Sequence, residues 1–435
     1  MQINARKDMI KTVLPLSFIV ASRFFGLFVV LPVLSLYALN LKGANELLVG
    51  LLVGGYALTQ MALQVPFGSL SDKFGRKNTM TFGLIVFIIG SLICAQATDI
   101  YTMLIGRLVQ GSGAVGAVAT AMISDFTTEE KRGHAMAIMG GMIGVAFAIS
   151  MVVSPILSSK FGLASLFYLS AALTFACIVL LYTVVPKESK IHHHDAKAPF
   201  LNLITQKNLF IMNITNLMQK MLMSAAFVAI PIVLVNHLGY DSSRLWIVYL
   251  AAMVFGFISM GLAGFLGDAK GHSKKLLLIG VVLFIISYLD FAFSENSLAF
   301  IIGVTLFFIG FNLHEPIMQS CASKFALASQ KGAALGVFNA FGYAGSFLGG
   351  AVGGYFLHKF NITYLAIFYS ILSVFWLVLL FMLSDPKLFK NLYLKDADLS
   401  KLDFVDGIVE RYKNQKGYVV KYNSSIINEK QLRDI

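Results

Sequence analysis

Long runs of apolar residues follow one another along almost the whole chain and are separated by short polar segments. A helix that crosses a bilayer needs roughly 20 mostly apolar residues. Twelve runs approach or exceed that length, near residues 12–38, 47–70, 79–96, 100–123, 135–157, 164–185, 209–235, 245–266, 275–293, 297–321, 333–357 and 362–383. The pattern predicts an all-α polytopic membrane protein with twelve transmembrane helices.

Lys and Arg are unevenly distributed over the connecting segments. If the N-terminus is cytoplasmic, seventeen of those before residue 384 fall on the cytoplasmic side, and only four, Lys42, Lys160, Arg244 and Lys359, fall on the other. Cytoplasmic loops of membrane proteins carry an excess of Lys and Arg. We therefore expect a cytoplasmic N-terminus, and twelve spans return the C-terminus to the same side.

The composition agrees with a chain that is mostly in lipid. Of its 435 residues 57% are hydrophobic and 13% are charged, whereas soluble domains carry roughly 25% charged residues. The net charge of +12 is explained by loops beside anionic lipids, so we expect membrane lipids and no nucleic acid as partners.

Several other kinds of function leave no trace in the sequence. The three cysteines all lie in apolar runs and suggest no disulfide framework, and no Walker-type phosphate loop or nucleophile–base set is present. The run His192-His193-His194-Asp195 has no second ligand cluster. We expect neither an enzyme nor a bound metal or cofactor.

The spans fall into two halves. A polar, basic segment at residues 186–208 separates six spans in residues 1–185 from six in 209–384. Gly68-Ser-Leu-Ser-Asp72-Lys-Phe-Gly75, after span two, is echoed by Gly264-Phe-Leu-Gly-Asp268-Ala-Lys-Gly271 after span eight. Parallel repeats with a substrate site between them are typical of one large class of secondary transporters.

Four short stretches carry a resemblance to a known family. The stretch from Gly68 to Lys77 resembles the loop motif between spans two and three of the major facilitator superfamily, and residues 107–113 resemble its span-four motif. A closer likeness, in residues 22–34 and 311–315, is to the YajR-type proteins, which are proposed drug/proton antiporters of bacterial inner membranes. The resemblance implies the major facilitator fold, with two pseudo-symmetric six-helix halves, and a multi-pass protein of the inner membrane.

The resemblance also concerns the tail, residues 385–435. Residues 388–394 and 417–422 are typical of strands, 404–414 of an amphipathic helix and 428–434 of a short helix. This β-α-β-α order suggests a shortened form of the small cytoplasmic ferredoxin-like α/β domain of the YajR type. We expect it to dock on the membrane domain or to dimerise, with the transporter itself a monomer.

The loop motif suggests a conformational switch made of Gly68, Asp72, Gly75, Arg76, Lys77 and, at the end of span four, Asp125. An arginine between two carboxylates can form charge-assisted bonds to both. The resemblance implies that this cluster helps to hold the outward-open state. The alternative is a solvated basic loop that only sets topology.

Polar side chains inside spans are costly and usually functional. A substrate cavity is predicted from those that share helix faces: Arg23, Gln60, Gln64, Arg107, Gln110, Asn213, Asn216, Lys220 and Asn312. The alternative is that the amides form hydrogen bonds that hold helices together. Arg23 has no acidic partner in its own half, which leaves the substrate or Glu315 as its counter-charge.

Proton coupling needs a group whose ionisation responds to access. Glu315 is the first candidate because burial favours its protonation, although a nearby Lys220 would oppose this. His314 titrates in the right range, but it lies about 100° around the helix from Glu315.

Small residues repeat every four positions in two spans. Span eleven has Gly345, Gly349 and Gly353, together with Gly350 and Gly354, and span five has Gly140 and Gly144. Such faces allow close helix packing, and we expect it in both spans.

These features favour a secondary transporter that works by alternating access, with protons and a small molecule as its ligands. Proton-coupled export of amphiphilic compounds or drugs is the first hypothesis. Span five keeps only Pro155 of the glycine-rich pattern of many antiporters. Uptake of a small metabolite, including an anionic one, by a symporter or facilitator therefore stays open.

Overall fold

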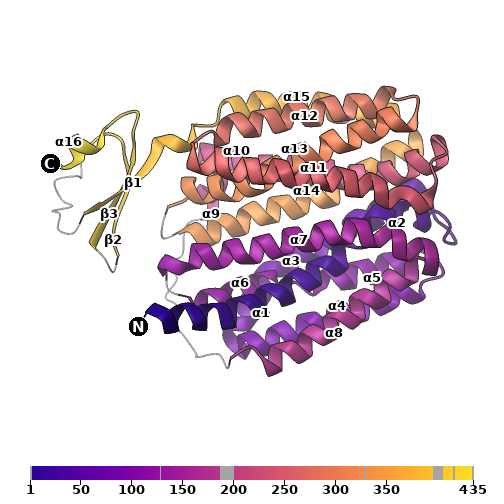
Figure 1. The fold of residues 1–435 in the computed structure, drawn as a ribbon, viewed down its shortest axis with the longest axis horizontal. Helices are drawn as coiled ribbons and strands as arrows, with labels where there is room; N and C mark the ends of the chain where they lie inside the picture. The colour runs from indigo at the N-terminus through magenta and orange to yellow at the C-terminus, as the bar shows by residue number, and fades with distance from the viewer. Residues whose placement is uncertain are drawn as a thin grey trace.

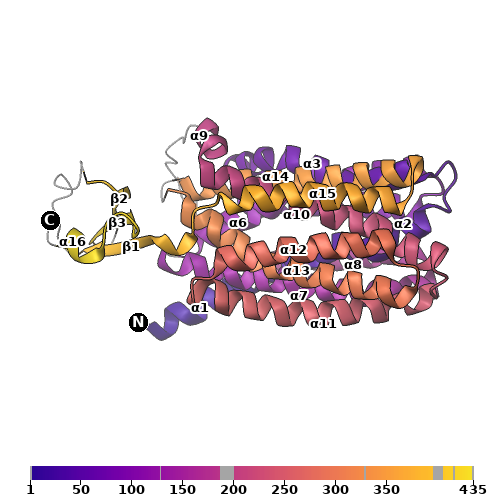
Figure 2. The ribbon, with the colours of Figure 1, turned by 90° about the horizontal axis from the view of Figure 1, so that it is seen from above.

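The computed structural model describes residues 2–127, 129–186, 200–327, 330–394, 405–414 and 417–433. It is a bundle of long helices with a small sheet beyond one end, and both chain termini lie at that end (Figure 1). We call it the terminal end and the opposite end the distal end. Figure 2 shows the sheet beyond the terminal end of the bundle, joined to it by the segment after the last long helix.

The first part of the chain forms eight helices. They are α1 (Gln2–Phe28), α2 (Leu31–Ala38), α3 (Glu46–Phe74), α4 (Arg76–Gln96), α5 (Ile100–Ser112), α6 (Gly116–Asp125), α7 (Glu129–Phe161) and α8 (Leu163–Thr183). Pro32, in the first turn of α2, suits a helix start because it has no N–H to leave unpaired.

The second part forms seven more helices, with two π-helical turns as extensions. They are α9 (Phe200–Thr205), α10 (Lys207–Ile232) with η1 (Val233–His237), α11 (Leu245–Gly264) with η3 (Phe265–Ala269), α12 (Ser273–Phe293), α13 (Ser297–Phe325), α14 (Lys331–Lys359) and α15 (Ile362–Phe381). A 3₁₀ turn, Ser242–Arg244, precedes α11. The two parts contact each other mainly through α3 with α14, α7 with α11 and α2 with α10.

Helix starts at the distal end are set by local sequence. Asn45, Asp99, Asn296 and Asn361 stand just before α3, α5, α13 and α15, and each side chain accepts a hydrogen bond from a backbone N–H of the first turn. Such caps satisfy donors that the helix itself cannot pair. The short distal loops therefore contain the capping residues with which the next helices begin.

Within the described residues, eleven helices are long and apolar enough to cross a membrane. The twelfth expected span, residues 100–123, is interrupted and forms α5 and α6. The break lies at Gly113, where ψ is 61°. A Cβ at Gly113 would lie 2.3 Å from the carbonyl oxygen of Gly83, so this residue lets the broken chain pack directly against α4.

Large apolar side chains are exposed on the outer helices, for example Phe175 on α8 at 63%, Ile258 on α11 at 57% and Phe375 on α15 at 68%. A water-soluble surface seldom exposes so many. These helices are apolar on their outer as well as their inner faces, as expected for lipid contact.

The expected β-α-β-α tail is wrong in its second element. The tail forms a three-stranded antiparallel sheet of β1 (Phe389–Leu394), β2 (Ile408–Asn414) and β3 (Gly417–Asn423), in the order β1-β3-β2, followed by α16 (Glu429–Arg433). Residues 408–414 pair with β3 instead of forming a helix. Two residues connect β2 to β3, which is a favoured hairpin length, and β-branched and aromatic residues suit the paired strand. A ferredoxin-like domain is not confirmed.

Candidate functional site

The loop motif forms an ion cluster at the terminal end. Arg76 Nε donates to Asp125 Oδ2 over 3.0 Å, and Arg76 Nη1 donates to Asp72 and to the Ser71 hydroxyl. The cluster joins α3, α4 and α6. Gly75 has a φ of +93°, which side-chain-bearing residues rarely adopt, so glycine is required between α3 and α4.

The two carboxylates of this cluster differ in their surroundings. The Arg76 and Asp125 side chains are each 11% exposed, whereas the Asp72 side chain is 64% exposed. Exposed ion pairs contribute little because water and salt screen them. Asp125 is therefore the stronger partner of Arg76. Ser71 was not predicted as a member, although it stands inside the motif.

Two other predicted switch residues lie nearby. Lys77 Nζ donates to the carbonyl oxygen of Val185 over 2.6 Å, just beyond the end of α8. A Cβ at Gly68 would lie 3.9 Å from the Cβ of Ala117 on α6, which is an ordinary contact.

Two predicted cavity residues, Arg23 on α1 and Arg107 on α5, are fully buried. Arg23 Nη2 donates to Gln60 over 3.1 Å, and its guanidinium lies against the rings of Phe24 and Phe87. Nε and Nη1 of Arg23 have no hydrogen-bond partner in the described part of the chain. Its predicted counter-charge is thus replaced by an amide and two rings.

Arg107 is held in a similar way. Its Nη1 donates to Gln110 over 2.6 Å, and its guanidinium lies 4.7 Å from the Tyr56 ring centroid. Among the described residues nothing accepts a hydrogen bond from Nη2. Gln110 in turn donates to Ser91 on α4 over 2.9 Å. Buried charged donors without partners are costly, so both arginines are candidate ligand-binding groups.

Gln60 links Arg23 to the other part of the molecule. Its Nε2 donates to the hydroxyl of Tyr343 on α14 over 2.8 Å. Tyr343 was not predicted, and its only sequence signal is a polar ring in a glycine-rich span. Gln64, one turn further along α3, lies beside the start of α6, where a Cβ at Gly116 would be 3.3 Å from its Nε2.

The three predicted asparagines bond to backbone. Asn213 donates to Leu203 O, Asn216 to Phe338 O and Asn312 to Phe308 O, at 3.3, 2.7 and 2.9 Å. The Asn213 and Asn216 contacts join α10 to α9 and α14, which favours the alternative in which the amides hold helices together, whereas the Asn312 contact lies within α13.

Lys220 and Glu315 form an ion pair between α10 and α13. Their side chains are 24% and 32% exposed, so the pair is accessible although both residues are deep within long helices. The ammonium lies 4.7 Å from the Phe311 ring centroid. Among the predicted cavity and coupling residues, Lys220 and Glu315 have opposite charges, contact each other directly and are partly exposed.

His314 is separated from this pair. It is fully buried, its Nε2 lies 2.8 Å from Leu277 O on α12, and it packs edge-on against Phe284 and Trp376. Because a carbonyl only accepts, Nε2 carries the hydrogen. Gly280 makes room for the ring, since a Cβ there would lie 2.3 Å from Nε2.

α3 and α14 pack closely in their distal halves. A Cβ at Gly50 would lie 2.2 Å from Gly350 O, and Glu46 pairs with His358 over 3.0 Å. This contact was not predicted residue by residue. The glycine pattern of span eleven was its signal, because Gly350 and Gly354 face α3.

The remaining glycines of span eleven confirm the prediction of close packing. Cβ atoms at Gly345 and Gly349 would lie only 2.1 and 2.0 Å from backbone oxygens of α10, which is far inside van der Waals contact. The same prediction for span five is wrong, since Cβ atoms at Gly140 and Gly144 would meet nothing described within 4 Å.

Within the described residues no group of three or more His, Cys, Asp or Glu could hold a metal ion. The run His192–His194 lies outside those residues.

The helical bundle and the buried charges define a membrane transporter, and the sequence comparisons specify its family. The model of the Major Facilitator Superfamily matches residues 16–350 and 209–404. The chain belongs to this superfamily and is a multi-pass membrane transporter rather than an enzyme, as the motifs predicted.

The relatives include two named transporters. The chain is 35% identical over 369 residues to the inner membrane transport protein YajR of Escherichia coli K12, covering 84% of this chain and 81% of that protein. It is 25% identical over 292 residues to the multidrug resistance protein MdtL of Klebsiella pneumoniae, covering 64% and 72%. The crystal structure of a D-xylose-proton symporter superposes with a TM-score of 0.72 at 15% identity, covering 86% and 98%, which supports the fold alone.

Proposed function

We propose that this transporter exports small amphiphilic compounds in exchange for protons, and that Glu315 carries the coupled proton. The observation that carries the proposal is the accessible Lys220–Glu315 ion pair. In this proposal the terminal end is cytoplasmic, the protein lies in the inner membrane, and the proton gradient drives transport without a bound cofactor.

The ion pair suits coupling because its two states differ in charge. Ionised Glu315 attracts Lys220, whereas a proton taken up by the carboxylate removes that attraction and frees the ammonium. A compound that interacts with the carboxylate competes with the proton for the same group. Such competition is what exchange of one for the other requires.

The Arg76 cluster then serves as the conformational switch. It ties α3, α4 and α6 together through charge-assisted bonds, and changes in these bonds accompany the change of access. The name of one relative, a multidrug resistance protein, supports export, and that of another, an inner membrane transport protein, supports the location.

The test uses purified protein in proteoliposomes under an imposed pH gradient, with a panel of labelled compounds. Glu315→Gln is expected to lose pH-driven transport but to keep exchange of substrate for substrate. Glu295→Gln, which removes an exposed carboxylate in a distal loop, is the matched control. Full pH-driven transport by Glu315→Gln would overturn the assignment of the coupling residue.

One observation favours a second function, uptake of a small anionic metabolite by a symporter or facilitator. The N–H groups of Arg23 and Arg107 that have no acceptor among the described residues could bind a carboxylate or phosphate. The sign of the substrate-induced pH change separates the two, because antiport moves protons against the substrate and symport moves them with it. A facilitator gives no pH change.

A further inference from the structure

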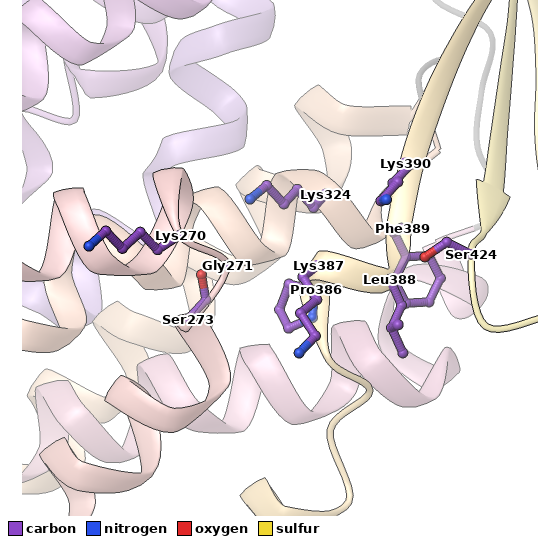
Figure 3. A pocket seen from close by; sticks show the side chains of 10 residues that line it. All are labelled: Lys270, Gly271, Ser273, Lys324, Pro386, Lys387, Leu388, Phe389, Lys390 and Ser424. Carbon is purple, nitrogen blue, oxygen red and sulfur yellow. The ribbon is translucent and has the colours of Figure 1, made fainter. Parts of the chain in front are cut away.

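A cavity of about 460 Å³ lies where the tail meets the terminal end of the bundle. Its walls come from two sources, as Figure 3 shows: Lys270 and Lys324 belong to the bundle, whereas Lys387, just before β1, and Lys390, within β1, belong to the tail. This volume is within the range of about 300–1,000 Å³ typical of small-molecule sites. We call it the junction pocket.

The junction pocket is strongly basic. Four of its ten lining residues are lysines, and none of the ten described lining residues is acidic. One carboxylate is close, since Asp385 Oδ2 lies 3.3 Å from Lys387 Nζ. Four positive charges around one cavity repel each other, and a bound anion relieves that repulsion.

The tail is held in place beside the pocket by short-range contacts. A Cβ at Gly271 would lie 3.2 Å from the Cβ of Lys387, so the turn before α12 and the tail pack closely. The ring of Phe389 packs edge-on against Phe325 at 5.3 Å, and Lys421 Nζ donates to Ala326 O over 2.7 Å. The pocket therefore exists only while the tail is docked.

The surroundings identify the source of the anion. The bundle side of the pocket lies at the ends of η3 and α13, and the tail side follows α15 by a few residues. These helices are long and apolar enough to span a membrane, so their ends are expected near its surface. Lys270 Nζ lies 5.0 Å from the ring of Phe265, which is 58% exposed. Phe381 and Met382, at the end of α15, are 61% and 56% exposed.

Figure 3 shows that the four amines are spread around the pocket and do not meet at one point. One phosphate group can touch only some of them, and the others act on it at longer range through their charge. A phospholipid phosphate in this position has its headgroup among the lysines and its acyl chains along the exposed apolar side chains. Basic pockets of this kind suit anionic headgroups.

We propose that the junction pocket binds the phosphate of an anionic phospholipid and that this lipid holds the tail against the bundle. The lipid phosphate contacts lysines on both sides of the pocket, Lys270 or Lys324 of the bundle and Lys387 or Lys390 of the tail. This inference is independent of the transported substrate and of Glu315.

The test compares full-length protein in nanodiscs of phosphatidylcholine alone and of phosphatidylcholine with phosphatidylglycerol. Phosphatidylglycerol is expected to raise the melting temperature and to protect the tail from proteolysis. A variant with Lys270, Lys324, Lys387 and Lys390 changed to Gln is expected to lose most of both effects. A control variant loses the same positive charge and is expected to keep both effects. In it the exposed residues Lys42, Lys160, Lys207 and Lys359 are changed to Gln.

Two further arms decide the remaining outcomes. Inorganic phosphate or glycerol phosphate, added to phosphatidylcholine nanodiscs, is expected to have no effect, and full protection by either would overturn the lipid assignment. Photoreactive phosphatidylglycerol is expected to label wild-type peptides around residues 265–275 and 381–390, which avoids any folding defect of the variant. Equal losses in variant and control, or no labelling there, would also overturn the proposal.

Discussion

The side-chain amide of Gln60 donates a hydrogen bond of 2.8 Å to the Tyr343 hydroxyl, while its carbonyl oxygen accepts one of 3.1 Å from Arg23. One amide thus connects α1, α3 and α14. A ligand that moves the Arg23 guanidinium therefore also acts on the contact between the two parts of the molecule.

Tyr343→Phe is expected to weaken the α3–α14 contact, because it leaves the Gln60 amide without its acceptor. A buried group left unpaired costs about 1–3 kcal/mol, so the equilibrium should move at least about fivefold toward the separated state. The measurement is labelling of Ser346→Cys, a buried position, in a background without native cysteines. Tyr355→Phe, at an exposed position of the same helix, should not change the labelling rate, and equal rates in both variants would contradict the prediction.

Gly50→Ala is expected to prevent the distal contact, since its Cβ would lie 2.2 Å from Gly350 O. Overpacking typically costs about 1–3 kcal/mol. Disulfide formation between cysteines at positions 46 and 358, whose native side chains are in contact, should fall severalfold. Gly144→Ala is the control, because a Cβ there meets nothing described within 4 Å. Unchanged cross-linking in Gly50→Ala would show that the two helices accommodate the added methyl group without separating, and would contradict the prediction.

Asp125→Asn is expected to disturb the switch more than Asp72→Asn. Asp125 is the less exposed partner of Arg76, and removing its charge should cost about 1–3 kcal/mol. The exposed Asp72 should contribute less than about 1 kcal/mol. Cysteine accessibility at both ends of the bundle measures the shift, with Lys73→Gln as a neighbouring control. Equal shifts for the two variants would mean that side-chain exposure does not determine how strongly each aspartate stabilises the cluster.

Tail docking is expected to strengthen as the pH rises from about 8 to 10.5. Burial lowers the pKa of Lys421 from 10.5 to about 8, with Glu410 raising it and Lys331 lowering it further. Between these values the undocked lysine binds more protons than the docked one, so deprotonation favours docking. Distances between spin labels on β1 and α12 measure how much of the tail is docked at each pH. Lys421→Met should remove this pH dependence, and a pH dependence of opposite sign would contradict the assignment.

The membrane-spanning helices and the family follow from the sequence, because both depend on local properties. A run of about 20 apolar residues is long enough to cross the bilayer wherever it lies in the chain. The stretch from Gly68 to Lys77 consists of the end of one helix, a turn and the start of the next helix. The Arg76–Asp125 pair was predictable because both residues stand at helix ends on the same side of the membrane. The amphipathic pattern of residues 404–414 predicted a helix, and this prediction is wrong because strand pairing of residues 408–414 depends on β3 and not on local periodicity.

The partners of the buried polar groups were decided only by the tertiary structure. Nothing near Gln60 in the sequence points to Tyr343, which is 283 positions away. The glycines of span five and span eleven look alike, yet only those of span eleven meet another backbone. A helix has several faces of similar composition, and which of them meets which neighbour is settled by the packing of the whole bundle. The junction pocket is of the same kind, because its lysines come from segments that only the docked tail brings together.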